Sequence, residues 1–202
     1  ERPFKSPHHT VSQAGLIGGG SIPKPGEVSL SHLGVLFLDE LPEFARPALE
    51  ALREPLETGH ITIARAARRA EFPARFQLLA AMNPCPCGYL GDMERSCRRV
   101  PICGEEYQKK ISGPLLDRID IHLSLPALPP QDLGNLKEGE SSTIIKDRVQ
   151  RARLFQKERN KNLLNSRLSG KFLEEATPLS LESQSLLLSA AEKFKFSARS
   201  YF

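Results

Sequence analysis

Two adjacent carboxylates that directly follow an apolar run are the residues best suited to chemistry in this sequence. Residues 34–38 (Gly-Val-Leu-Phe-Leu) show no polar alternation, and Asp39 and Glu40 come next. Such a run predicts a strand covered on both faces, as in a parallel α/β sheet, and open α/β sheets bind ligands at the carboxyl ends of their strands. One carboxylate could hold Mg²⁺ while the other orients or deprotonates an attacking water, as in nucleotide hydrolases. The alternative is a solvated loop with two exposed acids.

A second apolar run ends in a polar amide. Residues 77–82 predict another buried strand, and Asn83 follows it. An amide at the carboxyl end of a strand could sense a phosphate group or hold the attacking water. Alternatively, Asn83 only caps the turn before Pro84.

A single arginine precedes a third predicted strand. Residues 121–125 alternate between apolar and polar, and Arg118 lies just before them. If this guanidinium serves the phosphate of a neighbouring subunit, we expect it to point out of its own domain. The alternative is a local ion pair with Asp117 or Asp120, which would stabilise little if exposed.

Four cysteines lie within one short segment and nowhere else in the chain. They are Cys85, Cys87, Cys97 and Cys103, so the spacing is C-x-C, nine residues, then C-x5-C. Four thiolates could form a tetrahedral zinc site. The alternative is four reduced thiols in a flexible, charged insertion.

A basic tip is predicted for a β-hairpin. Residues 60–65 alternate, and residues 71–76 could pair back onto them. Between the two runs lie Arg65, Arg68 and Arg69, which could contact nucleic acid. The alternative is a solvated turn.

The remaining segments suggest how the chain is organised. Residues 1–33 are rich in Gly, Pro, Ser and His, so we expect a functional loop and little core. A helix is predicted after Pro47, with a kink at Pro55 and a stop at Gly59. Basic and apolar residues at helical spacing predict a helix over 143–168 and one or two more over 179–194. The predicted domains are an α/β core at 1–127, a linker at 128–142 and a helical domain at 143–202.

Composition sets broad limits on location and partners. The 202 residues are 40% hydrophobic and 26% charged, with a net charge of +4 that permits a nucleic-acid partner. No apolar stretch approaches the roughly 18 residues of a membrane span, and no signal peptide is recognisable. We therefore expect a cytoplasmic protein with no membrane contact. The glycines at 18–20 and the Ser-Gly-Lys-Phe at 169–172 both lack the spacing of a complete phosphate-binding loop.

Motifs that cover most of residues 1–125 carry a family resemblance. They lie at 2–10 (Arg-Pro-Phe-Lys-Ser-Pro-His-His-Thr), 15–20, 25–30, 34–44, 81–89 and 112–120. In these motifs and their order the chain resembles the Mg-chelatase-like AAA+ ATPases of the YifB/ComM type. The later part of the chain matches more loosely, through the basic helix and the Ser-Ala-Arg at 197–199.

The resemblance implies a fold and a set of residue roles. The fold is a partial AAA+ P-loop-type parallel sheet with a β-hairpin insertion, followed by a small helical lid. Asp39 and Glu40 would be the Walker B pair, which act on Mg²⁺ and on the attacking water respectively. The other implied roles are sensor 1 for Asn83, the arginine finger for Arg118 and sensor 2 for Arg199. The family's phosphate-binding loop would precede residue 1, so we expect this chain alone to bind ATP weakly or not at all.

The resemblance also implies a function. The expected activity is that of an ATP- and Mg²⁺-dependent motor in a homo-oligomeric ring, taken as a hexamer. It would act on DNA as a helicase or in branch migration, in recombination or natural transformation. One alternative is a chelatase-like ATPase that drives metal insertion or protein remodelling, and another is a non-hydrolysing zinc-containing interaction module. The family's second cysteine pair is closely spaced, whereas this chain has Arg99 at that position and Cys103 later, which leaves zinc binding open.

Overall fold

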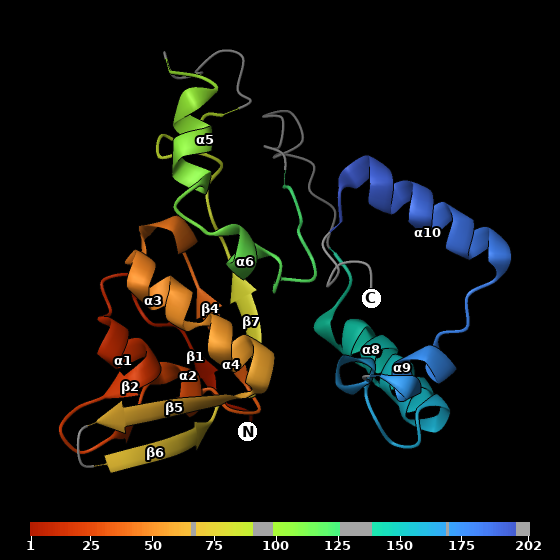
Figure 1. The fold of residues 1–202 in the computed structure, drawn as a ribbon, viewed down its shortest axis with the longest axis horizontal. Coiled ribbons are helices and arrows are strands. Elements are labelled where there is room, and N and C mark those ends of the chain that lie inside the picture. The colour runs from red at the N-terminus through yellow and green to blue at the C-terminus, as the bar shows by residue number, and fades with distance from the viewer. Residues whose placement is uncertain (66–67, 91–98, 126–138, 169, 197–202) are drawn as a thin grey trace. The chain divides into compact units, whose positions relative to one another are not determined.

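The computed structural model describes residues 1–65, 68–90, 99–125, 139–168 and 170–196 (Figure 1). The chain divides into two compact units, Glu1–His122 and Leu123–Phe202. The first contains all the strands described, and the described elements of the second are helical. The predicted domain boundaries remain a prediction.

A three-stranded parallel sheet forms the centre of the first unit. Its strands are β1 (Phe4–Lys5), β4 (Val35–Leu38) and β7 (Gln77–Ala80), in the order β1-β4-β7. All the pairs are parallel, with Leu38 opposite Ala80 at the carboxyl ends of β4 and β7. The predicted α/β fold class is therefore confirmed, and so is a strand that ends directly before the acidic pair.

The described residues fully bury one face of this sheet and cover the other only in part. Leu36 and Leu38 of β4 are fully buried in the core, under the helices α3 (Arg46–Ala51) and α4 (Arg53–Thr58) (Figure 1). On the other face Leu79 is 52% exposed. The predicted burial of β4 on both faces, and of β7 throughout, is thus wrong for this chain.

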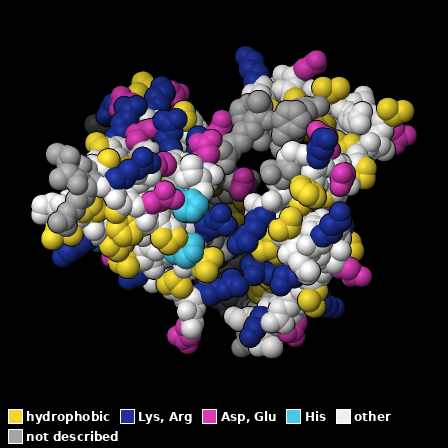
Figure 2. All heavy atoms as spheres, turned by 60° about the horizontal axis from the view of Figure 1, so that its bottom comes forward, with side chains coloured by type: hydrophobic (Ala, Val, Ile, Leu, Met, Phe, Trp, Pro, Cys, Tyr) yellow, Lys and Arg dark blue, Asp and Glu magenta, His cyan; other side chains and the backbone are white. Residues whose placement is uncertain are grey.

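The open face carries further apolar side chains. Phe4 is 62% exposed and stacks on Phe37, with ring centroids 6.4 Å apart. Figure 2 shows hydrophobic side chains exposed among charged ones on the side of the molecule in view. The apolar character of β4 is therefore explained on one face by the core, and in part on the other, where Val35 and Phe37 are half-buried.

The first 33 residues contribute to the core, which corrects the prediction that they add little to it. They form β1, α1 (Gln13–Ile17), β2 (Gly18–Gly19), β3 (Lys24–Pro25) and α2 (Glu27–Leu30). Leu16 and Val28 are fully buried. Elements of two to five residues are too short to show a hydrophobic period, so the sequence pattern could not reveal them.

Close backbone approach explains two of the glycines in this region. A Cβ on Gly26 would lie 2.4 Å from the Gly18 nitrogen, and one on Gly34 would lie 1.9 Å from the Pro3 carbonyl oxygen. These glycines allow backbone segments to touch, and they do not mark a flexible loop.

The helix predicted after Pro47 is present but divided. It forms α3 and α4, with Leu52 between them, and Gly59 ends α4 in the left-handed conformation at φ 75°. Pro55 has no N–H to donate to the carbonyl of Ala51, which agrees with a break at this point. The short 3₁₀ helix η1 (Leu41–Glu43) links β4 to α3.

The β-hairpin is confirmed, but its basic residues are placed differently. Strands β5 (His60–Arg65) and β6 (Arg68–Pro73) pair antiparallel, with Arg65 opposite Arg68 and Ala64 opposite Arg69. Because β6 begins at Arg68 and not at residue 71, all three arginines lie on paired strands. The tip, residues 66–67, is outside the described residues.

The segment after β7 contains two short helices but no further strand among the described residues. These are α5 (Ile102–Gln108) and α6 (Gly113–Leu116), and Ile111 and Leu115 join the core. The strand predicted over 121–125 is wrong: the segment pairs with no described strand, and Leu125 is 91% exposed. Alternation alone does not make a strand where no neighbouring backbone accepts its hydrogen bonds.

The second unit contains α8 (Ser142–Arg159), η2 (Asn165–Arg167), α9 (Lys171–Ala176) and α10 (Leu181–Phe194). The basic helix ends at Arg159, earlier than the predicted residue 168. Its apolar residues, such as Val149 and Phe155, are exposed. Among the helices described, none combines the length and the apolar character needed to cross a membrane.

Replacing Gly34 with Ala is expected to lower the free energy of unfolding by about 1–3 kcal/mol, as overpacking does in other cores. The clash is with the backbone of Pro3, which cannot move aside as a flexible side chain could. Gly113→Ala is the control, because a Cβ there meets nothing within 4 Å. Chemical denaturation of the two variants measures the difference, and equal midpoints would contradict the proposed clash.

Candidate functional site

The acidic pair lies at the carboxyl end of β4, as predicted. Asp39 and Glu40 are both exposed. Glu40 adopts the left-handed conformation (φ 53°, ψ 47°), and its N–H donates to Asp39 Oδ1 at 2.9 Å. A left-handed residue other than glycine is uncommon and costs about 1–2 kcal/mol. The turn ends the strand at once and leaves both carboxylates at the edge of the sheet.

Asn83 lies at the same edge. The chain after β7 is hydrogen-bonded to the chain on either side of the acids: Ala81 N–H donates to the Leu38 carbonyl, and Leu41 N–H donates to the Ala81 carbonyl, each at 3.0 Å. Asn83 follows two residues later and is exposed. The structure therefore brings two acids and an amide to one edge, which is the arrangement that the strand pattern predicted.

His9 is a site residue that sequence reasoning missed. Its Nδ1 lies 3.1 Å from Glu40 Oε2. The ring also contacts the ring of His8, with centroids 4.1 Å apart, and lies roughly perpendicular to the ring of Phe44, at 6.4 Å. The His-His pair stands in the first family motif, but that motif assigned it no role. Only the fold brings it to the acidic pair.

Arg118 is folded back onto its own unit, which contradicts the expectation that it points outward. Its Nη2 lies 2.5 Å from Glu57 Oε2, and its Nη1 donates to the Pro114 carbonyl at 2.6 Å. The side chain is only 13% exposed, and its Nε is buried with no hydrogen-bond partner among the described residues. The ion pair is thus with Glu57 on α4 and not with either sequence neighbour, Asp117 or Asp120. The structure does not place Arg118 on the acidic pair.

Several predicted site residues lie outside the described residues. These are Arg199 and Cys97, together with the side chains of Arg65 and Arg68, whose backbones belong to the hairpin. Arg69 is described and exposed. The proposed roles of Arg199 and Cys97 therefore remain predictions.

Three of the four cysteines converge. The Sγ atoms of Cys85, Cys87 and Cys103 all lie within 4.8 Å of one another, and those of Cys85 and Cys87 are 3.2 Å apart. Cys85 and Cys103 are buried, whereas Cys87 is exposed. Two of these residues follow β7 and the third lies near the start of α5.

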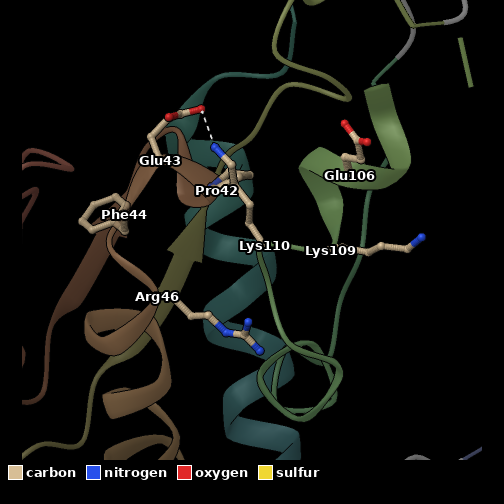
Figure 3. A pocket seen from close by; sticks show the side chains of 7 residues that line it. All are labelled: Pro42, Glu43, Phe44, Arg46, Glu106, Lys109 and Lys110. Atoms are coloured by element: carbon tan, nitrogen blue, oxygen red, sulfur yellow. Dashed lines mark ion pairs between the residues drawn. The ribbon is translucent and has the colours of Figure 1, made fainter. Parts of the chain in front are cut away.

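An open cleft of about 380 Å³ lies between η1 and α5 (Figure 3). Its lining is Pro42, Glu43, Phe44, Arg46, Glu106, Lys109 and Lys110. Lys110 Nζ and Glu43 Oε1 are 3.5 Å apart across it. Burial and the neighbouring Glu43 carboxylate raise the pKa of Tyr107 on α5 to about 12. The side-chain hydrogen bond between Tyr107 and Glu43 links α5 to η1.

These features together define a class of protein. The first unit has a parallel sheet with an acidic pair and an amide at its carboxyl edge, and the second unit is helical. This arrangement is consistent with a partial AAA+ core followed by its helical region. The family model described as magnesium chelatase, subunit ChlI, matches residues 1–133, and its C-terminal counterpart matches residues 139–202. The chain belongs to this magnesium chelatase ChlI family.

Individual relatives give the same result. Competence protein ComM of Haemophilus influenzae is 45% identical over 203 residues, which cover all of this chain and 39% of the relative. The protein YifB of Salmonella typhimurium is 48% identical over 87% of this chain and 34% of its own length. YifB of Escherichia coli is 47% identical over 90% of this chain and 36% of its own length. The chain thus spans little more than a third of the length of these relatives.

Removing the partner of Arg118 is expected to destabilise the first unit. Glu57→Ala should lower the free energy of unfolding by about 1 kcal/mol, because it removes a hydrogen bond to a charged group that solvent partly screens. Glu54→Ala is the control on the same helix, since Glu54 is also exposed. Urea denaturation distinguishes the two, and equal losses would show that the ion pair does not hold Arg118.

Proposed function

We propose that the protein containing this chain is an ATPase that uses ATP and Mg²⁺ and works as a ring of identical subunits. The observation that carries the proposal is the placement of Asp39, Glu40 and Asn83 at one edge of a parallel sheet. Family membership supports an AAA+-type role. Binding of a zinc ion by the cysteines is a separate proposal, which concerns the stability of the fold and not ATP hydrolysis.

The residues at this edge suit the proposed cofactors. Magnesium prefers carboxylate oxygens, and the exposed Asp39 offers one beyond the Oδ1 atom that accepts from the Glu40 backbone. When bound, Mg²⁺ and ATP supply a phosphoryl group whose negative charge is partly neutralised. Glu40 is then the base that accepts a proton from the attacking water, and Asn83 orients that water or the phosphate.

His9 orients the proposed base. Its imidazole contacts Glu40 Oε2 and is itself fixed by His8 and Phe44. A carboxylate held at one oxygen has fewer orientations, and catalysis depends on such positioning. We therefore assign His9 as a positioning residue for Glu40.

Arg118 is the proposed arginine finger, although its present partner lies in the same chain. A guanidinium that pairs with Glu57 at 2.5 Å has to exchange that carboxylate for a phosphate before it can act on a neighbouring subunit. Head-to-tail contacts that repeat with a suitable rotation close into a ring. Arg199 is proposed as the sensor 2 arginine, which reaches the γ-phosphate from the helical lid.

DNA is the proposed substrate of the motor. The β5–β6 hairpin brings Arg65, Arg68 and Arg69 together at one end, and a relative that covers the whole chain is named a competence protein. These observations favour helicase or branch-migration activity in recombination or natural transformation. Metal insertion or protein remodelling is the second candidate function, because the matching family model is described as magnesium chelatase, subunit ChlI.

Glu40→Gln in the full-length protein is expected to lower kcat by on the order of 100-fold or more while ATP still binds, because it removes the general base. Glu54→Gln, at an exposed position on α4, is the control and should change kcat little. His9→Ala should lower kcat less than Glu40→Gln does, and His9→Asn, which retains a hydrogen-bond donor, should recover part of the loss. Steady-state ATP turnover and nucleotide titrations measure these effects. Full activity of Glu40→Gln would exclude the proposed mechanism.

Neutralising Arg65, Arg68 and Arg69 to Ala is expected to weaken DNA binding by the full-length protein. The slope of log affinity against log salt should fall by roughly 1 for each phosphate that an arginine no longer neutralises, so by about 3 in all. Lys171, Lys193 and Lys195, all exposed, provide a control with the same change of charge. Fluorescence anisotropy with single-stranded and branched DNA gives the affinities. Equal losses of affinity in the two variants would show that the hairpin arginines contribute only through the overall positive charge of the protein. Absence of any DNA binding would favour metal insertion or protein remodelling as the function.

A further inference from the structure

Three cysteine thiols form a cluster that the proposed ATPase mechanism does not use. Cys85, Cys87 and Cys103 are brought together from the loop after β7 and from α5. They are the one group of three or more potential metal ligands found within the described parts of the chain. Thiolate sulfur is a soft ligand that selects zinc over magnesium or calcium.

The geometry suits one bound ion. Zinc–sulfur bonds of about 2.3 Å in a tetrahedron place sulfur atoms about 3.8 Å apart. The three Sγ atoms lie within 4.8 Å of one another, with 3.2 Å between Cys85 and Cys87. Side-chain shifts of about 1 Å or less would therefore bring all three onto one ion.

Neither a disulfide nor apolar packing accounts for the cluster as well as a metal does. The 3.2 Å between Cys85 Sγ and Cys87 Sγ is too long for a disulfide bond, which needs about 2.05 Å. Buried cysteines can serve only as small hydrophobic side chains, and Cys85 and Cys103 are buried. Cys87, however, is exposed, so packing does not explain why its sulfur lies against the other two.

The surrounding contacts bring α5 close to the loop. A Cβ on Gly104, next to Cys103, would lie only 2.6 Å from Leu90 Cδ2 and 3.4 Å from the Pro84 carbonyl oxygen, so this position needs a residue without a side chain. Gln108 Nε2 donates to the same Pro84 carbonyl at 3.1 Å. The helix thus already contacts the loop at Pro84 and Leu90, which flank Cys85 and Cys87.

We propose that Cys85, Cys87 and Cys103 bind a structural zinc ion that fixes α5 to the loop following Asn83. The three thiolates leave one position of a tetrahedral ion for water or another ligand. Cys85 comes two residues after Asn83, and α5 leads through α6 to Arg118. The ion would therefore hold the proposed sensor and the segment of the proposed arginine finger in one rigid unit.

The first test is the metal content of the purified full-length protein, measured by mass spectrometry after gel filtration. About one zinc per chain is expected in the wild type. Cys87→Ser should lose it, and because Cys87 is exposed this change does not disturb buried packing. Cys87→His should retain zinc, since imidazole is also a zinc ligand. Cobalt in place of zinc should give sulfur-to-metal charge-transfer absorption in the wild type that weakens in Cys87→Ser.

A second measurement follows the thiols themselves. Iodoacetamide should label Cys87 slowly in the zinc-loaded protein and rapidly after chelation, because metal-bound thiolates are shielded. Wild-type protein that takes up neither zinc nor cobalt would overturn the proposal, as would a Cys87→Ser variant that is folded by circular dichroism and binds as much metal as the wild type. If Cys87→Ser does not fold, loss of zinc from Cys87→His decides against the site. Neither measurement depends on ATP turnover, so the two proposals can fail separately.

Discussion

Parallel pairing of β4 with β7 is the constraint on which the rest of the site depends. Parallel strands place their carboxyl ends at the same edge, so the residues that follow each strand must meet there. The hydrogen bonds from Ala81 to Leu38 and from Leu41 to Ala81 continue this pairing beyond the strands. They join the segment that carries the acidic pair to the segment that leads to Asn83 through backbone hydrogen bonds. A slip of one residue would turn Leu36 and Leu38 out of the core, so burial and site geometry are specified together.

In the described residues, one face of the sheet is fully packed and the other only in part. Leu36, Leu38, Leu49 and Leu52 are buried together, whereas Phe4 and Leu79 remain largely exposed on the opposite face. An exposed apolar face on a parallel sheet is unusual, since such sheets are normally covered on both sides. The helices of the second unit likewise expose apolar residues such as Val149 and Phe155. In both units, the apolar pattern of the sequence is more extensive than the packing that the described residues provide.

Short-range contacts between charged groups then fix the positions of individual side chains around this sheet. His9 reaches Glu40 at 3.1 Å, and Arg118 reaches Glu57 at 2.5 Å. The second contact gives the guanidinium a partner within its own chain, so the proposed action in trans requires a competition between a carboxylate and a phosphate. That requirement makes Glu57 as relevant to the proposed mechanism as Arg118 itself.

The sequence by itself determined the elements whose signal is local. The apolar run before Asp39, the alternation of β5, the glycine that ends α4 and the run before Asn83 each specify a conformation through their own backbone and side chains. Order along the chain was then enough to predict the acidic pair and the amide at one edge. Only the tertiary structure decided which distant residues meet: His9 with Glu40, Arg118 with Glu57, and Cys103 with Cys85. It also placed Leu16 and Val28 in the core and left residues 121–125 unpaired with any described strand. These outcomes depend on packing between segments far apart in the chain, or on elements too short to show a period, and a local pattern carries no information about either.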